Sequence, residues 1–220
     1  MDIRFRNRTE AGSRLAGALS AFATRDDLLV LALPRGGVPV AFEVARALAA
    51  PLDVFVVRKL GVPQQEELAM GAIGSGGVQV LNREVINLLD IPATVIERVA
   101  ARERRELERR ELIYRAGLPV LEPRGRTVIL VDDGIAAGSS MLAAIGALRK
   151  RDVARIVVAV PVVAVDVAVV MRRTADEVVA VATPDDFGGV GQWYDDFTQT
   201  TDEEVTALLA RTDDGDKPES

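Results

Sequence analysis

The sequence predicts an α/β fold in which a parallel β-sheet is covered by helices on both faces. Short runs of apolar, largely β-branched residues recur along the chain, separated by stretches with a helical pattern. The runs are continuously apolar rather than alternating, which is typical of strands buried on both faces. The chain has 220 residues, 49% of them hydrophobic, which is enough for one domain with a substantial core.

Five strands and two helices follow from these patterns. Strands are expected over residues 28–33, 54–57, 127–131, 156–160 and 177–181, and helices over residues 39–49 and 140–151. Residues 70–80 are predicted to form hairpin strands that turn at Ser75, Gly76 and Gly77. Because strands and helices alternate, the connections should be right-handed crossovers, and ligands are expected at the carboxyl ends of the strands.

Three segments depart from this alternation. Residues 9–23 show the apolar face of a helix, and residues 94–115 form a long charged helix with Arg and Glu four residues apart. Residues 184–201 are rich in Gly, Asp and aromatic side chains. We expect one domain over residues 1–210, with a hood and appendages near 1–23, 90–116 and 184–205, and a disordered tail over 211–220.

The composition excludes several classes of function. The chain has no cysteine and no histidine, so it holds no disulfide, no Cys/His zinc site and no Ser-His-Asp triad. Any bound metal must be held by oxygen, which favours Mg²⁺, Mn²⁺ or Ca²⁺. A net charge of −6 argues against general nucleic-acid binding. No apolar signal segment is visible, and residues 156–165 are too short to span a bilayer, so a cytoplasmic protein is expected.

The segment VILVDDGIAAGSS, residues 128–140, carries the strongest chemical signal. An apolar strand runs into Asp132 and Asp133, and a helix follows the intervening loop. Small side chains let this loop curl around an anion, so that backbone amides and the helix N-terminus point at a phosphate. The loop residues are Ala136, Ala137, Gly138, Ser139 and Ser140. Two carboxylates beside a phosphate suit a ligand that also presents hydroxyls or Mg²⁺, whereas an ordinary helix N-cap accounts for only one of them.

This arrangement resembles the motif with which type I phosphoribosyltransferases bind PRPP, 5-phosphoribosyl-1-pyrophosphate. The resemblance implies a Rossmann-like parallel sheet with a hood. It also implies that Asp132 and Asp133 bind the ribose hydroxyls and support positive charge on the sugar ring, while residues 136–140 bind the 5-phosphate. Mg²⁺ would be held mainly by PRPP and water, with no direct protein ligand.

A second segment, LALPRGGVPVA at residues 31–41, supports the resemblance. The expected strand ends in Arg35, Gly36 and Gly37, where glycine permits close backbone approach and arginine offers a fork of donors to a phosphate. Alone, such a segment more often indicates an ordinary turn. In the family, the loop after the first core strand binds pyrophosphate, which implies that role for these three residues.

Arg58 and Lys59, after the second expected strand, are further candidates for binding pyrophosphate. Family members carry a mobile loop after this region that closes over PRPP, which makes the polar stretch beyond Lys59 a candidate lid. The alternative interpretation is a surface turn with solvated cations.

Four of the nine aromatic residues lie within residues 187–197. The hood of type I members binds the base, so Trp193 or Tyr194 is the candidate to stack on it. The alternative is that these rings anchor an irregular C-terminal segment onto the core, because most buried aromatic side chains serve packing.

Together the motifs imply a phosphoribosyltransferase, an enzyme that transfers the 5-phosphoribosyl group from Mg²⁺-bound PRPP to a nitrogenous base or related amine and releases pyrophosphate. Ala136 stands where members acting on 6-oxopurines carry an acidic residue, which argues against hypoxanthine or guanine as the acceptor. Gly134 replaces a residue that is usually apolar and is a second departure from the family pattern.

The alternative function is a non-catalytic, PRPP-sensing regulatory module. Some family members regulate by binding nucleic acid, and the helix at residues 94–115 would then be the contact surface. Interleaved charges favour a solvated helix instead, so the expected partners are PRPP and an acceptor, with a homodimer expected at the level of the family.

Overall fold

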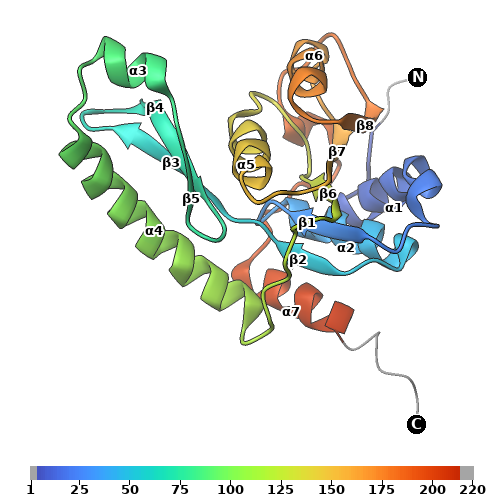
Figure 1. The fold of residues 1–220 in the computed structure, drawn as a ribbon. Helices are drawn as coiled ribbons and strands as arrows, with labels where there is room; N and C mark the ends of the chain where they lie inside the picture. Colours follow the sequence, from blue (N-terminus) through green and yellow to red (C-terminus); the bar gives the residue numbers. More distant parts are fainter. Residues whose placement is uncertain (1–3, 214–220) are drawn as a thin grey trace.

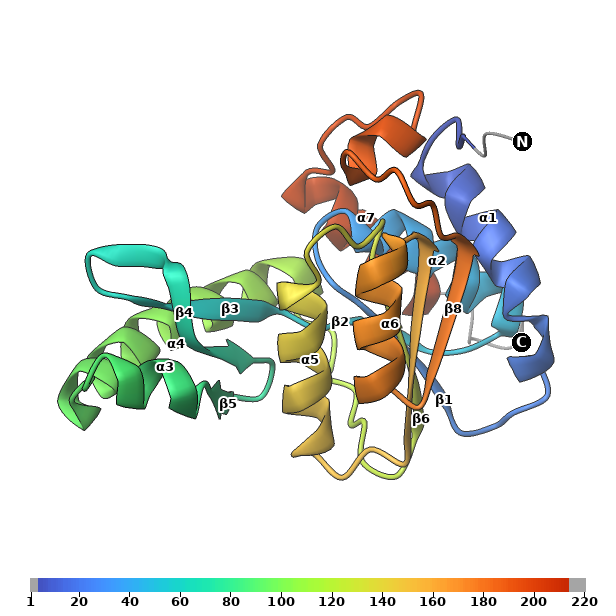
Figure 2. The ribbon, with the colours of Figure 1, turned by 90° about the horizontal axis from the view of Figure 1, so that it is seen from above.

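A computed structural model of the protein describes residues 4–213 (Figure 1). Its main sheet is parallel, with the strand order β2-β1-β6-β7-β8. The strands in that order are Leu52–Val54, Leu28–Ala32, Thr127–Val131, Arg155–Val162 and Glu177–Ala182. Helices α1 (Arg8–Ala18) and α2 (Gly37–Leu48) cover one face, while α5 (Ser139–Arg149) and α6 (Val165–Thr174) cover the other (Figure 2). The predicted α/β class is therefore confirmed.

A second, antiparallel sheet stands beside the main sheet (Figure 1). It consists of β3 (Val57–Val62), β4 (Gln65–Gly74) and β5 (Val78–Leu81), followed by α3 (Arg83–Leu88) and α4 (Ala93–Arg115). We call residues 57–115 the hairpin unit. The turn predicted at Ser75 to Gly77 is present, since the Gly77 amide donates to the Gly74 carbonyl at 3.0 Å.

The single strand predicted over residues 54–57 is wrong. The chain leaves the main sheet after Val54, passes through buried Phe55 and Val56, and enters β3 of the second sheet. The apolar run VFVV is continuous across this change because both sheets are packed against buried side chains. Beyond Lys59 the chain continues as β3 and β4, which pair with each other as a hairpin, and the lid role of this stretch stays a prediction.

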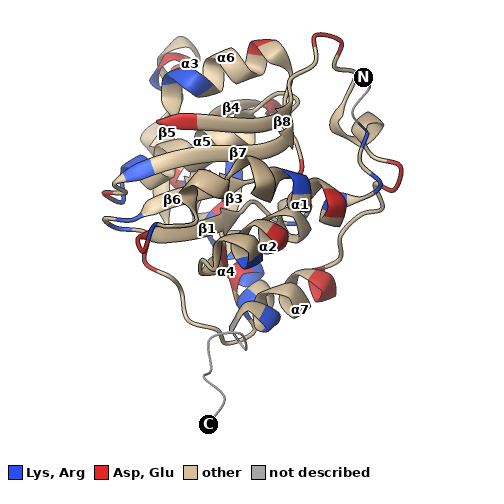
Figure 3. Cartoon of the chain, turned by 90° about the vertical axis from the view of Figure 1, so that its right-hand side faces the viewer, with Lys and Arg blue, Asp and Glu red and all other residues tan. Residues whose placement is uncertain are grey.

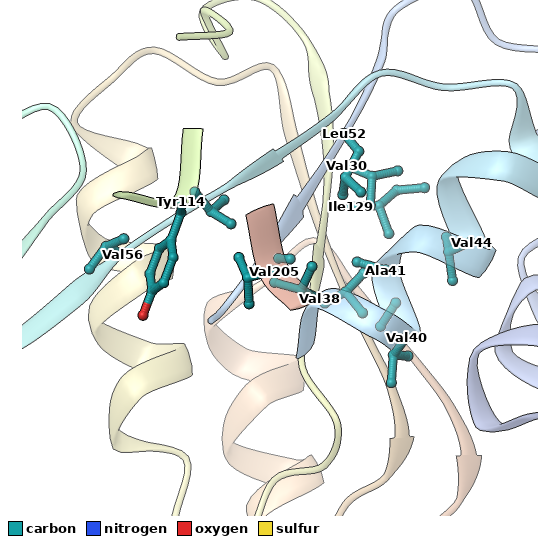
Figure 4. Packing of buried hydrophobic residues seen from close by; sticks show 14 of the residues in the cluster. Val30, Val38, Val40, Ala41, Val44, Leu52, Val56, Tyr114, Ile129 and Val205 are labelled. Carbon is teal, nitrogen blue, oxygen red and sulfur yellow. The ribbon is translucent and has the colours of Figure 1, made fainter. Parts of the chain in front are cut away.

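Two hydrophobic clusters fill the two sides of the main sheet. Alternate residues of β1, β6 and β7 enter each cluster, as in β1, where Val30 belongs to one and Leu31 to the other. Figure 4 shows the first cluster, in which Val38 and Ala41 of α2 meet Val205 from the C-terminal helix. The continuous burial of β1, β6 and nearly all of β7 explains why these strands are apolar on both faces.

The chain ends differ from the expected boundaries. The helix predicted over residues 9–23 ends at Ala18 and is followed by a 3₁₀ turn, Ser20–Phe22. At the other end, helix α7 covers Asp202–Asp213, so it extends into the predicted tail, of which residues 214–220 lie outside the described part. Within residues 4–213, no helix has both the length and the apolar character needed to cross a membrane.

Candidate functional site

The loops after β1 and β6 leave the main sheet side by side. These strands pair in parallel with Ala32 opposite Val131, and the Leu33 amide donates to the Val131 carbonyl at 2.8 Å. The chain then turns through Arg35 and Gly36 into α2, while the other loop begins with Asp132. Because carboxyl ends of parallel strands share one edge, the two segments singled out in the sequence meet there.

The two glycines allow this approach. A β-carbon added to Gly36 would lie 2.1 Å from Oδ2 of Asp133, and one added to Gly37 would lie 2.8 Å from the Val131 carbonyl oxygen. Any side chain larger than hydrogen at Gly36 would therefore collide with the carboxylate. The structure explains this glycine pair by contact with the acidic residues, because neither glycine adopts a positive φ.

Asp132 and Asp133, which we call the acidic pair, are both partly buried. Oδ1 of Asp132 accepts the Asp133 amide at 2.8 Å. Burial and the adjacent Asp133 charge raise the pKa of Asp132 well above its ordinary value. Burial also raises the pKa of Asp133, although the neighbouring Arg8 opposes that shift. Two carboxylates are thus held where ionising both is costly.

Residues 136–140, which we call the phosphate loop, lie directly beyond the acidic pair. Gly138 adopts φ +77° and caps α5, and a β-carbon there would lie 2.5 Å from Cε of Met171. Among the described residues, the amides from Ala136 to Met141 donate no hydrogen bond to the protein. Ala136, Ala137, Ser139 and Ser140 are exposed. The loop and the N-terminus of α5 therefore present free donors to an anion.

Arg35 lies in the same turn as the two glycines, and its Nη1 is 3.5 Å from a carboxylate oxygen of Asp202 at the start of α7. The structure therefore brings Arg35, Gly36 and Gly37 together with the acidic pair, through a turn that α7 contacts. The side chain of Arg35 is one-third exposed.

Arg58 and Lys59 do not join this cluster through any contact in the described part of the chain. Both lie on β3, where Arg58 donates to Oε2 of Glu103 in α4 at 2.7 and 2.9 Å. Lys59 is 3.5 Å from Glu67 across the hairpin. Their role in binding pyrophosphate stays a prediction, and the structure shows that Arg58 fastens β3 to α4.

The C-terminal residues 184–201, which we call the hood segment, pack over the acidic pair. The Tyr194 hydroxyl donates to the Asp133 carbonyl at 2.6 Å, and its ring contacts Phe5 and Phe197. Tyr194 is only 2% exposed, so it fits the alternative interpretation of an anchor rather than a face open to a base. A β-carbon on Gly134 would lie 2.6 Å from Val190, which accounts for glycine at this unusual position.

Trp193 is placed differently from Tyr194. Its ring stacks on Phe187 with the centroids 6.3 Å apart, and its side chain is only partly buried. Its Nε1 is the one buried side-chain donor in residues 4–213 that has no hydrogen-bond partner. Trp193 therefore retains both an aromatic face and an unpaired donor within the hood segment.

Sequence reasoning did not single out Arg8, which is the first residue of α1. Nη2 of Arg8 lies 2.8 Å from Oδ2 of Asp133, and the two side chains are 11% and 14% exposed. The residues are 125 positions apart. No local pattern signals this pair, because Arg8 occupies an ordinary position in the first turn of a helix.

Charge elsewhere is distributed without a single dominant sign. In the view of Figure 3, basic and acidic residues are interspersed along the ribbon. On α4, Glu106 pairs with both Arg109 and Arg110, while Arg115 is buried against Asp53 of β2. The helix expected to be solvated is therefore also an anchor between the two sheets. Residues 4–213 contain no group of three acidic side chains arranged to hold a metal ion.

A family model for the phosphoribosyl transferase domain matches residues 64–193. A protein of Mycobacterium tuberculosis, named only as a candidate phosphoribosyl transferase, is 47% identical over 207 residues in each of two strains. That alignment covers 94% of this chain and 46% of the relative, so the chain spans about half the length of the curated relatives it matches. The crystal structure of TT1426 from Thermus thermophilus is 45% identical, covers 94% of this chain and 98% of that one, and superposes with a TM-score of 0.85.

Proposed function

The chain belongs to the phosphoribosyl transferase domain family, and from this premise we propose that it transfers the 5-phosphoribosyl group of Mg²⁺-bound PRPP to a nitrogen of an acceptor. The observation that carries the proposal is the close contact between the Gly36 turn and the acidic pair, beside the free amides of the phosphate loop. PRPP presents a pyrophosphate, two ribose hydroxyls and a 5-phosphate. The three protein segments supply one complementary group for each.

The phosphate loop would bind the 5-phosphate through its backbone amides and the N-terminus of α5. Asp132 and Asp133 would accept hydrogen bonds from the ribose hydroxyls. The turn at Arg35 and Gly36 would bind the pyrophosphate, with the Arg35 guanidinium as a charged donor. Each of the three segments is thus assigned to the part of PRPP that its donors or acceptors can bind.

In the transfer, the bond from C1 of ribose to the pyrophosphate oxygen breaks, and a bond from C1 to the acceptor nitrogen forms. Pyrophosphate leaves with the electron pair of the broken bond, and the acceptor nitrogen loses its proton. Positive charge develops on the sugar ring between these events, where the acidic pair would stabilise it. When bound, Mg²⁺ would neutralise charge on the pyrophosphate, and the carboxylate-containing site suits such a hydrated cation.

No histidine or thiol is needed for this chemistry. The protein must hold both reactants in line and keep water away from C1. The hood segment covers the acidic pair on one side, and the partly exposed ring of Trp193 would offer a stacking face to an acceptor base. Ala136 offers no acid to an acceptor, which favours acceptors other than 6-oxopurines.

The test is pyrophosphate release from Mg²⁺-PRPP in the presence of a panel of bases and amines. One acceptor should support turnover by the wild type, and the double variant Asp132→Asn with Asp133→Asn should lower that turnover roughly 10²–10³-fold. Glu106→Gln alters a partly exposed carboxylate on α4, away from the acidic pair, and is the matched control that should retain wild-type turnover.

Two outcomes would contradict this assignment. Unchanged turnover in the double variant would show that the acidic pair is not part of the site. Saturable PRPP binding without turnover of any acceptor would instead favour a PRPP-sensing module, and α4 would then be tested for nucleic-acid binding.

A further inference from the structure

Arg8 has no part in the transfer as described so far, yet it makes the most extensive contacts of any side chain at the acidic pair. Its Nε donates to Oδ2 of Asp133 at 2.9 Å, and its Nη2 lies 2.8 Å from the same oxygen in an ion pair. Its Nη1 donates to the Thr198 carbonyl at 2.7 Å. The guanidinium carbon lies 4.1 Å from the Phe197 ring centroid, in cation–π geometry. One arginine therefore links α1, the end of β6 and the hood segment.

The geometry treats the two oxygens of Asp133 differently. Oδ2 accepts the hydrogen bond from Arg8 Nε, contacts Nη2 and faces Gly36, whereas Oδ1 accepts no hydrogen bond from residues 4–213. The main chain of Asp133 is fixed independently, because its carbonyl accepts the Tyr194 hydroxyl. Arg8 thus fixes the orientation of the carboxylate and leaves one oxygen available to a ligand.

Four titratable groups surround this contact, namely Asp132, Asp133, the Tyr194 hydroxyl and, beside Arg8, Asp196. Asp132 is partly buried, and Tyr194 is buried and hydrogen-bonded through its hydroxyl. Asp196 is exposed and accepts from Thr198. Arg8 is the one cation that lies within ion-pair distance of either carboxylate of the acidic pair in the described residues. It lowers the pKa of both carboxyl groups against the opposing effect of burial.

We propose that Arg8 is a positioning residue of this site: it holds Oδ2 of Asp133 and balances the charge of the acidic pair, so that Oδ1 can accept a ligand hydroxyl. As to the ligand, this inference rests on the proposed function. Arg8 itself contacts neither PRPP nor the acceptor in this account, because its donors are used by the protein.

The charge balance is tested without any ligand, by following the carboxyl ¹³C resonances of Asp132 and Asp133 during a pH titration. Arg8→Gln should raise the apparent pKa of the pair by about one unit, because a close cation is lost. Arg8→Lys should restore most of the wild-type titration. Arg4→Gln is the matched control, since Arg4 ties the same segment to Asp195 at 2.7 Å without touching the acidic pair.

Trp193 is the only tryptophan, so its emission reports whether the hood segment stays packed in each variant. An unshifted titration in Arg8→Gln would overturn the proposal. If Arg8→Gln also alters the Trp193 emission, Arg8→Lys decides the matter. If Arg8→Lys has wild-type emission and leaves the pKa of the acidic pair unshifted, the proposal is supported. If Arg8→Lys has wild-type emission but shows the full pKa shift of Arg8→Gln, the proposal is overturned.

The consequence for ligand binding is tested by calorimetry of Mg²⁺-PRPP between pH 6 and pH 9. Arg8→Gln should weaken binding roughly tenfold near pH 7, and the deficit should narrow at pH 9, where the pair ionises without Arg8. An equal deficit at every pH would indicate a purely structural role and overturn the proposal. A wild type that fails to bind PRPP would refute the proposed function, while the carboxyl titration would still decide the role of Arg8.

Discussion

The carboxyl edge of the main sheet and the hairpin unit use the same charged residue types in opposite ways. At the edge, Asp132 and Asp133 are adjacent and partly buried, and burial raises the pKa of each. On α4 of the hairpin unit, hydrogen bonds from Arg109 and Arg110 lower the pKa of Glu106 to about 2. At the edge of the main sheet the ionised carboxylates are destabilised by burial, whereas on α4 the carboxylate is stabilised by neighbouring arginines.

The difference separates a site from a scaffold. Ion pairs near the surface, such as those of Glu106, contribute little to the free energy of unfolding, and their charges keep the outer side of a long helix hydrated. Two adjacent carboxylates that are partly buried against a glycine turn destabilise the fold. Such an arrangement is typical of a functional site, where a bound ligand interacts with both groups. We therefore expect the chemistry at the edge of the main sheet and a supporting role for the hairpin unit.

The largest effect is expected where the two regions are joined. Asp53 of β2 accepts the Arg115 guanidinium of α4 at 2.8 Å and the amides of Val54 and Leu121, with both side chains below 10% exposed. Asp53→Ala removes the closer carboxylate partner of the buried Arg115, which keeps, among the described residues, only the 3.3 Å ion pair with Glu111, and it should lower the free energy of unfolding by about 3–5 kcal/mol in denaturant titrations. Glu67→Ala, in an exposed pair with Lys59, is the control and should cost less than about 0.5 kcal/mol. Equal losses of stability in the two variants would contradict the role of the Asp53–Arg115 pair in joining the main sheet to α4.

A smaller loss is expected from filling the space at the edge. Gly36→Ala places a β-carbon against the Asp133 carboxylate, and should lower the free energy of unfolding by about 1–3 kcal/mol and impair PRPP binding. Gly17→Ala, on the exposed side of α1 with no atom within 4 Å of the new carbon, should instead stabilise the helix by up to about 1 kcal/mol. A Gly36→Ala variant as stable as Gly17→Ala would contradict the close approach of the Gly36 turn to the Asp133 carboxylate.

The smallest effect has opposite signs in the two regions. Because the folded-state pKa of Asp132 is raised, its contribution to stability is present at low pH and is lost as the pH rises. At pH 8, Asp132→Asn should therefore have a free energy of unfolding about 1 kcal/mol higher than that of the wild type. At pH 4 it should show no such gain. For Glu106 the lowered pKa reverses the sign: its contribution is present above about pH 4.5 and is lost as the pH falls towards 2.

Glu106→Gln should accordingly lose stability near neutral pH, by no more than about 0.5 kcal/mol. Denaturant titrations at pH 4, 6 and 8 measure both variants. A loss of stability in Asp132→Asn that is the same at pH 4 and pH 8 would contradict the difference between the regions.

Local patterns in the sequence predicted the parts of the site that one strand and one loop create. The run before Asp132 and the run before Arg35 each specify a buried strand, and parallel pairing then brings their ends together. Gly36 and Gly37 were recognisable as a turn, although what they approach is visible only in the fold.

The remaining features depend on contacts between distant residues. Arg8 meets Asp133 across 125 positions, and the covering of Tyr194 depends on Phe5 at the opposite end of the chain. The apolar run through Val56 gave no sign of leaving one sheet for another. Helix α6 escaped prediction because it follows β7 after only two residues, Val163 and Ala164, both apolar, so no polar boundary separates them.

The most direct test of the central claim is titration calorimetry of PRPP with and without Mg²⁺, using the wild-type protein. The account predicts saturable binding that requires Mg²⁺ and is lost in the Asp132→Asn, Asp133→Asn double variant, while Glu106→Gln binds as the wild type does. Absence of PRPP binding by folded wild-type protein would contradict the assignment of the edge as a phosphoribosyl site, and the phosphate loop would then serve another anion.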